Sequence, residues 1–244
     1  MLDLKKYVNK KIGYGNPSGD YWFIGPEEGG SINGNKDRVE IWYELGENEH
    51  FHDMKKFHLS LCGLNEKYKR DLERFFIGDN IKLQSTWNGI IEILFGIIGN
   101  NNSKDEKRVY QSCLLGSKNG ETIIGELFPF SSKKLNDETS KNYFGLSKKD
   151  YWEKFSIERE ILLANQIEKY SPKVVVFYST TFNSNWKRII KTIDKNCNEL
   201  KIHSNLPLSY HKTSKTLFVI TPHPIARQFN KKKKAVGIAI KNLM

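Results

Sequence analysis

Residues 150–177 read DYWEKFSIEREILLANQIEKYSPKVVVF and place a helical pattern directly before a strand pattern. Between Asp150 and Tyr170, apolar residues recur at the spacing of one helix face, which predicts a single amphipathic helix. Much of that face is supplied by Phe155, Ile161, Leu162 and Ile167. Pro172 cannot continue the helix, and the β-branched run Lys173–Phe177 predicts a buried strand after it. A helix that leads into a buried strand is the unit from which α/β folds are built.

The same alternation extends to both ends of the chain. Three further apolar runs have the length of buried strands: Tyr21–Ile24, Thr122–Ile124 and Leu217–Ile220. Helical patterns occupy Asp53–Cys62, Asn65–Phe76, Trp87–Ile98, Trp186–Ile193 and Ala235–Leu243. Ser85 or Thr86 is the expected N-cap of the third. The polar segment Asn100–Lys107 predicts a surface loop, and Ser132–Lys149 is turn-like. We expect one domain over residues 1–244, an α/β three-layer α-β-α sandwich around a central, mainly parallel sheet of four strands.

Composition and charge narrow the class of protein. The 244 residues are 38% hydrophobic and carry 39 Lys and Arg against 28 Asp and Glu, a formal net charge of +11. This surplus favours a polyanionic partner, of which nucleic acid is the commonest. The longest apolar run, Gly89–Gly99, is too short to span a membrane, and the amino-terminal residues contain no apolar signal region. We therefore expect a cytoplasmic protein with no membrane partner. Cys62, Cys113 and Cys197 form no CxxC motif, which argues against a metal or disulfide framework.

Unusual polar segments follow three of the four predicted strands. They are Gly25–Ser31, Gly125–Phe130 and Thr221–Pro224. In parallel sheets, ligands bind in the crevice at the carboxyl ends of the strands. The three segments therefore predict a binding site at one edge of the sheet, without identifying its reaction.

These segments contain side chains that can take part in catalysis or ligand binding. Glu27 and Glu28 stand between a proline and two glycines. If successive side chains point to opposite sides, one carboxylate faces a crevice and the other faces outward. A carboxylate in a crevice can orient water or stabilise a cation. A solvated acidic turn is the alternative. His223, fixed between two prolines, can hydrogen-bond a leaving group or serve a structural role. The other histidines are interpreted as structural or solvated: His50, His52, His58, His203 and His211.

Taken in order, these segments resemble the uracil-DNA glycosylase superfamily. The resemblance rests on Trp22–Gly30, Gly125–Phe130, Val174–Tyr178 and Thr221–Pro224, and covers most of the chain. It implies a monofunctional glycosylase that flips a base out of DNA and hydrolyses its N-glycosidic bond, with no metal or organic cofactor and as a monomer. His223 would stabilise the departing base. Glu27 aligns with the catalytic carboxylate of one branch, and Glu28 remains the second candidate.

The departures from the family pattern bear on the base. The pyrimidine-reading Asn is replaced by Glu126, and an ionised carboxylate only accepts hydrogen bonds, which suits the amine of cytosine. A protonated Glu126, the alternative, could also donate and would remove half of this argument. Gly29 stands where one branch has a Tyr that closes off the pyrimidine 5-position. We therefore expect a 5-substituted cytosine, as in modified phage DNA, and a role in antiviral defence. The alternatives are a uracil-excising repair enzyme, an inactive nucleic-acid-binding module, and a hydrolase of free nucleosides.

Further residues receive roles from the same resemblance. The base-binding set adds Gly25, Pro26, Phe128 and Trp42, with Tyr43 as the fallback for stacking. Burial of these aromatic residues in the core is the alternative. The segment after His223 is expected to contact DNA through Ile225, Arg227, Gln228, Phe229, Lys231 and Lys232. Ile225 or Phe229 would fill the gap left by the flipped base.

Overall fold

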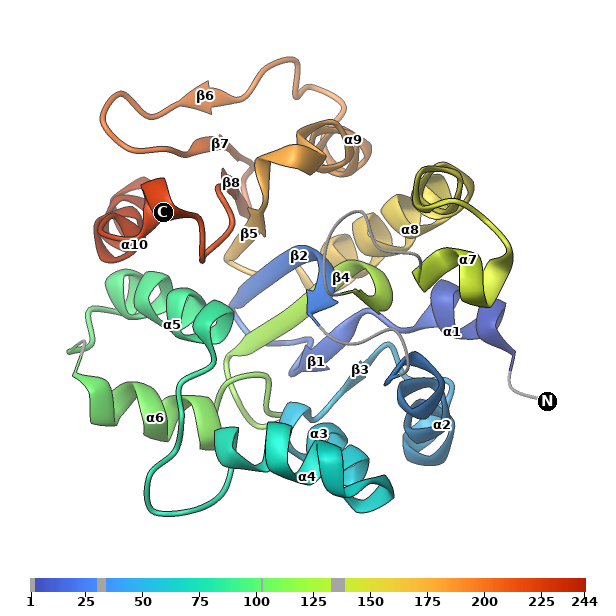
Figure 1. The fold of residues 1–244 in the computed structure, drawn as a ribbon. Coiled ribbons are helices and arrows are strands. Elements are labelled where there is room, and N and C mark those ends of the chain that lie inside the picture. Colours follow the sequence, from blue (N-terminus) through green and yellow to red (C-terminus); the bar gives the residue numbers. More distant parts are fainter. Residues whose placement is uncertain (1–2, 30–33, 102, 133–138) are drawn as a thin grey trace.

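The computed structural model describes residues 3–29, 34–101, 103–132 and 139–244, and these form an α/β fold with helices on both faces of one sheet (Figure 1). The α/β prediction is confirmed. The predicted number of strands is wrong: the described residues form a mixed sheet of eight, in the order β3-β1-β4-β2-β5-β8-β7-β6.

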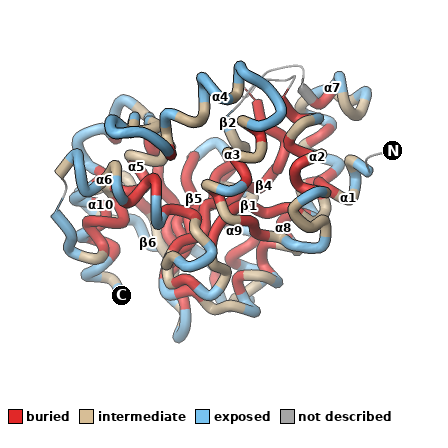
Figure 2. Tube along the Cα trace, turned by 90° about the horizontal axis from the view of Figure 1, so that it is seen from below, coloured by how far each residue is buried: buried red, intermediate tan, exposed pale blue. Residues whose placement is uncertain are grey.

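The four predicted strands are the central ones of this sheet. They are β2 (Tyr21–Gly29), β4 (Thr122–Ser132), β5 (Val174–Tyr178) and β8 (Leu217–Thr221). All neighbouring pairs among them are parallel, so their carboxyl ends meet at one edge. Figure 2 shows buried residues concentrated along this central region, as expected for a sheet covered on both faces.

The additional strands are short and lie at the two sides of the sheet. β1 (Gly13–Gly15) pairs antiparallel with β4, and β3 (Phe51–His52) pairs with β1. On the other side, β7 (Ser209–Lys212) pairs antiparallel with β8, and β6 (Lys201–Ile202) pairs with β7. Strands of two to four residues leave too little hydrophobic pattern to be predicted.

The helices agree with most predicted segments but differ at several ends. Their bounds are α1 Leu4–Lys10, α2 Gly34–Gly46, α3 Met54–Leu64, α4 Glu66–Leu72, α5 Ser85–Ile98, α6 Lys104–Cys113, α7 Thr139–Phe144, α8 Lys148–Tyr170, α9 Asn183–Ile193 and α10 Lys233–Leu243. The loop predicted at Asn100–Lys107 is wrong, because Ser103 and Glu106 form a capping box that starts α6. Gln84, rather than Ser85 or Thr86, caps α5.

Two helix contacts organise the layers. α5 and α10 cross closely at Gly96 and Gly237, where a Cβ on Gly237 would lie 2.1 Å from the backbone oxygen of Ile93. On the other face, α8 anchors β4 through fully buried Arg159, which donates to the backbone carbonyls of Val8, Glu126 and Leu127. Ile161, predicted on the buried face of α8, is 48% exposed. No helix in the described part of the chain is long and apolar enough to cross a membrane.

Candidate active site

A cleft of about 560 Å³ opens at the carboxyl ends of the central strands. Its volume is within the usual range for small-molecule sites. Seven residues of the predicted site line it: Pro26, Glu27, Glu28, Gly29, Glu126, His223 and Ile225. Segments far apart in the sequence therefore meet here, as the parallel topology requires. Gly30 and Ser31, which belong to the predicted loop, lie outside the described residues.

The glycine- and proline-rich segment after the first predicted strand is too irregular in sequence to predict a strand, yet much of it is strand, and the second predicted strand is longer than expected. β2 continues through Glu27 and Glu28 to Gly29, and β4 continues to Ser132. The pairing register shifts between Glu27 and Gly29, an irregularity of the kind that redirects side chains next to active sites. As neighbours on a strand, Glu27 and Glu28 have separate sets of partners, and both carboxylates are largely buried.

Gly25 is required by close packing at the floor of the cleft. A Cβ at this position would lie 2.3 Å from the ring of Tyr178, which belongs to β5. The Tyr178 hydroxyl in turn donates a 3.4 Å hydrogen bond to Oε1 of Glu126. Gly25 therefore contributes to the cleft indirectly, because its lack of a side chain leaves room for the Tyr178 ring.

Glu28 lies among cations. Its Oε1 accepts hydrogen bonds from Arg38 Nη1 (2.9 Å) and from His58 Nε2 (3.2 Å), and its Oε2 accepts one from the Tyr14 hydroxyl (2.9 Å). Lys11 Nζ is 3.9 Å away. Burial alone would raise the pKa of Glu28, but the Arg38 guanidinium, His58 and Lys11 together hold that pKa well below its usual range. Glu28 is therefore a carboxylate anion near neutral pH.

His58, which the sequence places among the structural or solvated histidines, is a buried residue that also borders the cleft. It is 1% exposed, lines the cleft, and contacts oxygen atoms through both ring nitrogens. Nδ1 lies 2.8 Å from the carbonyl oxygen of Met54, and Nε2 faces the Glu28 carboxylate. His58 therefore links the Met54 carbonyl of α3 to the Glu28 carboxylate.

Glu27 is held by a different set of partners. Oε1 accepts from Trp152 Nε1 (2.8 Å), while Oε2 accepts from Ser132 Oγ (2.5 Å) and from Lys148 Nζ (2.9 Å). Burial raises the pKa of Glu27, although Lys148 and these hydrogen bonds oppose the rise. Its side chain is 3% exposed against 11% for Glu28. Both oxygens of Glu27 are thus committed, and Glu28 has the greater access to the cleft.

Glu126 is buried at the floor of the cleft, where its surroundings oppose a negative charge. The residue is 6% exposed, and its Oε2 has no hydrogen-bond partner among the described residues. Burial, reinforced by the nearby Glu28 anion, raises the pKa of Glu126 well above its usual range. This shift favours the protonated form of Glu126 over the ionised, purely accepting one. A neutral carboxyl group presents one donor and one acceptor, as an Asn amide does.

Among the residues that the structure describes, none forms a hydrogen bond with Nε2 of His223. The backbone N–H of Ile225 donates to its Nδ1 (3.3 Å), which places the proton of a neutral ring on Nε2. Burial lowers the pKa of His223, which favours that neutral form. The ring packs edge-on against Tyr178, with centroids 5.3 Å apart. Gly89 of α5 allows close approach to the same loop, since a Cβ there would lie 2.8 Å from Pro224 Cβ.

Four aromatic residues of the predicted site do not line the cleft. Trp42, Phe128 and Phe229 are fully buried, and Tyr43 is half-buried with its hydroxyl on the backbone of Asp3. Trp42 packs edge-on against Tyr7, so it is not free to stack on a base. Phe229 is likewise a core residue rather than a wedge. The remaining predicted DNA contacts are exposed: Ile225, Arg227, Gln228, Lys231 and Lys232.

The wall opposite His223 was not predicted. It comes from α2, α3, the turn after α4 and α5, and includes Arg38, His58, Phe75 and Trp87. Trp87 packs against Phe75 at 5.8 Å and against His58 at 5.4 Å between ring centroids. These rings, rather than Trp42, are positioned to stack on a flat ligand. In the sequence, the helical spacing of these residues predicts only that they face the core. The wall itself forms by packing between segments that are far apart in the sequence.

Ser179 adds a strained backbone to the cleft. It follows β5 directly and has φ +99°, a conformation that non-glycine residues rarely adopt. Two hydrogen bonds hold it there, from its N–H to the Thr221 carbonyl and from Trp186 Nε1 to its own carbonyl. Strain of this kind is concentrated at functional sites.

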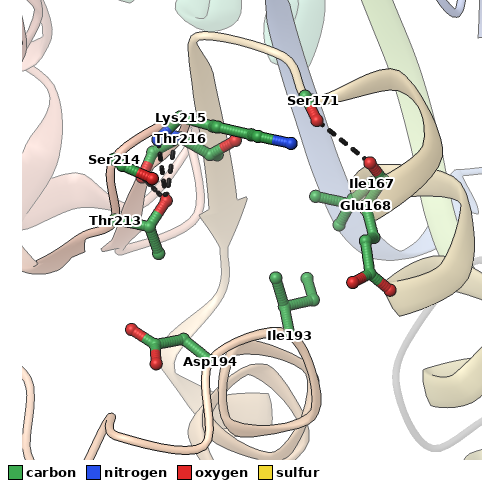
Figure 3. Close-up of a pocket in the computed structure, with 9 residues that line it drawn as sticks. All are labelled: Ile167, Glu168, Ser171, Ile193, Asp194, Thr213, Ser214, Lys215 and Thr216. Carbon is green, nitrogen blue, oxygen red and sulfur yellow. Dashed lines mark hydrogen bonds between the residues drawn. The ribbon is translucent and has the colours of Figure 1, made fainter.

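A second hollow lies at the amino ends of β5 and β8 (Figure 3). Glu168, Asp194 and Lys215 border it, and Asp194 is paired with His211 at 2.8 Å. The charged side chains drawn there are at least partly exposed, unlike Glu126, which is 6% exposed. The chemically distinctive groups are therefore in the first cleft.

Within the described residues, no group of three or more His, Cys, Asp or Glu side chains could hold a metal ion. No protein-family model matches the chain, and no curated protein matches it. The resemblance to the uracil-DNA glycosylase superfamily therefore stays a prediction, and the chemistry of the cleft is the basis for a function.

Proposed function

We propose that the chain is a monofunctional DNA glycosylase that holds an extruded base in this cleft and hydrolyses its N-glycosidic bond. The observation that carries the proposal is the pairing of a neutral His223, with a free Nε2–H, and an anionic Glu28 in one cleft. A hydrogen-bond donor for a leaving group and a carboxylate for a sugar cation are the two elements that such a hydrolysis needs.

The proposed reaction separates charge and then neutralises it. Heterolysis of the C1′–N bond sends the electron pair to the base, whose anion accepts a hydrogen bond from His223 Nε2. The sugar becomes an oxocarbenium-like cation, which Glu28 stabilises by its negative charge. Water adds at C1′ and its proton finally neutralises the base. A carboxylate with a low pKa is a weak base, but it can still orient water toward so reactive a cation.

The neutral Glu126 changes the expectation about the base. Its carbonyl oxygen and O–H can pair with N3–H and O4 of uracil, or with the amine and N3 of cytosine. The charge-based preference for cytosine is therefore withdrawn. The space at Gly29, where a Cβ would meet no atom of the described residues within 4 Å, still supports a pyrimidine with a 5-substituent. We propose a 5-substituted cytosine as the first base to test, with antiviral defence as its setting, and uracil in repair as the alternative.

DNA is the proposed partner because of the net charge of +11 and the exposed segment after His223. Arg227, Lys231 and Lys232 would contact phosphates, and Ile225, which is 60% exposed beside the cleft, would fill the gap left by the base.

Abasic-site formation and DNA binding, measured together, test this proposal. Glu28→Gln should reduce base release by about 10²–10³-fold while DNA affinity changes little, because it removes a charge used in the transition state. Glu160→Gln is the matched control, since Glu160 is also buried and ion-paired, with Arg188 and away from the cleft. A parent protein that binds DNA but releases no base would instead be a binding module. Activity on free nucleosides that is insensitive to salt would indicate a nucleoside hydrolase.

A further inference from the structure

Arg38 has donors that the Glu28 network does not use. It lies on α2, lines the cleft, and is 6% exposed. Nη1 donates to Glu28, and this is the one hydrogen bond that the guanidinium makes with the described residues. A guanidinium carries five N–H donors in a planar fork, which matches the two oxygens of a carboxylate or phosphate. The unused donors of Arg38 are not sealed in the core, so they are available to an acceptor that enters the cleft.

The surrounding charge also favours an anion. Arg38 Nη1 and Lys11 Nζ lie 2.9 Å and 3.9 Å from the Glu28 carboxylate, and burial raises the pKa of Glu126, which favours its neutral form. Lys11 is fully buried, and its Nζ has no hydrogen-bond partner among the described residues. Asp37, the acidic neighbour of Arg38 on α2, accepts from Tyr68 at 2.6 Å. An anionic group that enters beside Arg38 would therefore meet a guanidinium whose other donors are unused, while Glu28 keeps its own partners.

We propose that Arg38 forms an oxyanion subsite in the helical wall of the cleft, which holds a carboxylate or phosphate group of the ligand. The subsite deepens the proposed glycosylase function and rests on it for the pyrimidine nucleotide as the ligand. His58 uses both ring nitrogens elsewhere, so Arg38 provides the hydrogen bonds of the subsite.

Two parts of a nucleotide can supply the oxyanion, and matched ligand pairs distinguish them. Binding of 5-carboxyuracil against uracil tests an acidic substituent on the base. Binding of deoxyuridine 5′-monophosphate against deoxyuridine tests the backbone phosphate. Titrations followed by calorimetry or by NMR at low salt need no turnover, so they remain informative if no DNA releases a base.

The expected result is that at least one anionic ligand binds the parent about tenfold more tightly than its neutral counterpart, as a charged hydrogen-bonded pair allows. Arg38→Met should abolish that advantage, and Arg38→Lys, which keeps the charge but loses the fork, should retain only part of it. Arg188→Met, at a surface ion pair, is the control and should leave the advantage intact. Far-ultraviolet circular dichroism verifies that each variant is folded.

Equal affinities within both pairs for the parent protein would overturn the proposal, as would an advantage that survives Arg38→Met in a folded protein. Anion binding that depends on Arg38, without base release from any DNA, would support the subsite while rejecting the glycosylase. Base release without a preference for the anionic ligands would support the glycosylase and reject the subsite.

Discussion

Replacing Lys11 with methionine tests the charge balance beneath the cleft. Lys11 is fully buried, makes no hydrogen bond through Nζ with the described residues, and packs its ammonium 4.4 Å from the ring centroid of Tyr14. Burial lowers the pKa of Lys11 from its ordinary 10.5 to about 8, although Glu28 opposes this effect. The difference means that the charged lysine destabilises the folded state by about 3 kcal/mol relative to a neutral side chain.

The pH dependence follows from the sign of this difference. Below about pH 8 the lysine is protonated in both states, and the whole penalty applies. Above pH 8 the folded state releases its proton while the unfolded state keeps it up to 10.5, so the parent gains stability relative to Lys11→Met. Between about pH 7 and pH 10 the relative gain should be about 2.5 kcal/mol.

Urea unfolding of both proteins at several pH values measures this directly. The variant should be the more stable protein at pH 7, and its advantage should shrink steadily up to pH 10. Other titrating groups are shared and cancel in the difference. Lys5→Met, at an exposed position in α1, is the control and should follow the parent. A difference in unfolding free energy between parent and Lys11→Met that stays constant across this pH range would refute the lowered pKa of Lys11.

Two substitutions test the packing that positions the cleft. Gly25→Ala should destabilise the protein by about 1–3 kcal/mol and weaken ligand binding, because its Cβ would overlap the Tyr178 ring. Gly63→Ala is the control: a Cβ there would meet no atom of the described residues within 4 Å, so stability and ligand binding should change little. Arg159→Met should cost about 3 kcal/mol or more in urea unfolding, because three buried backbone carbonyls lose their donor, and a loss below about 1 kcal/mol would contradict that role.

The central strands could be predicted because burial on both faces leaves continuous apolar runs such as Lys173–Phe177. Their parallel order then brought the segments around Glu28, Glu126 and His223 to one edge. The sequence pattern could not supply the edge strands, which are too short, or the extension of β2 and β4 past glycine and proline, because inter-strand pairing determines it. The Ser103–Glu106 capping box was legible in the sequence, but the polar composition around it favoured a loop.

The charges of the site were the least predictable part. Glu126 is ionised in isolation and neutral in the fold, because burial and the Glu28 anion both oppose its charge. His58 and Arg38 lie on helices whose sequences give no sign that they border a cleft. Protonation states and walls of this kind depend on which segments pack together, and local patterns do not contain that information.

Mass spectrometry of the free bases released from a panel of DNAs tests the central claim most directly. The panel comprises single- and double-stranded DNA containing uracil, cytosine or 5-substituted cytosines, each incubated with the parent, Glu28→Gln or His223→Ala. The account predicts that the parent releases one or more pyrimidines and leaves abasic sites, and that both substitutions suppress this release. Absence of any released base from every DNA, or release that is unchanged in both variants, would contradict it.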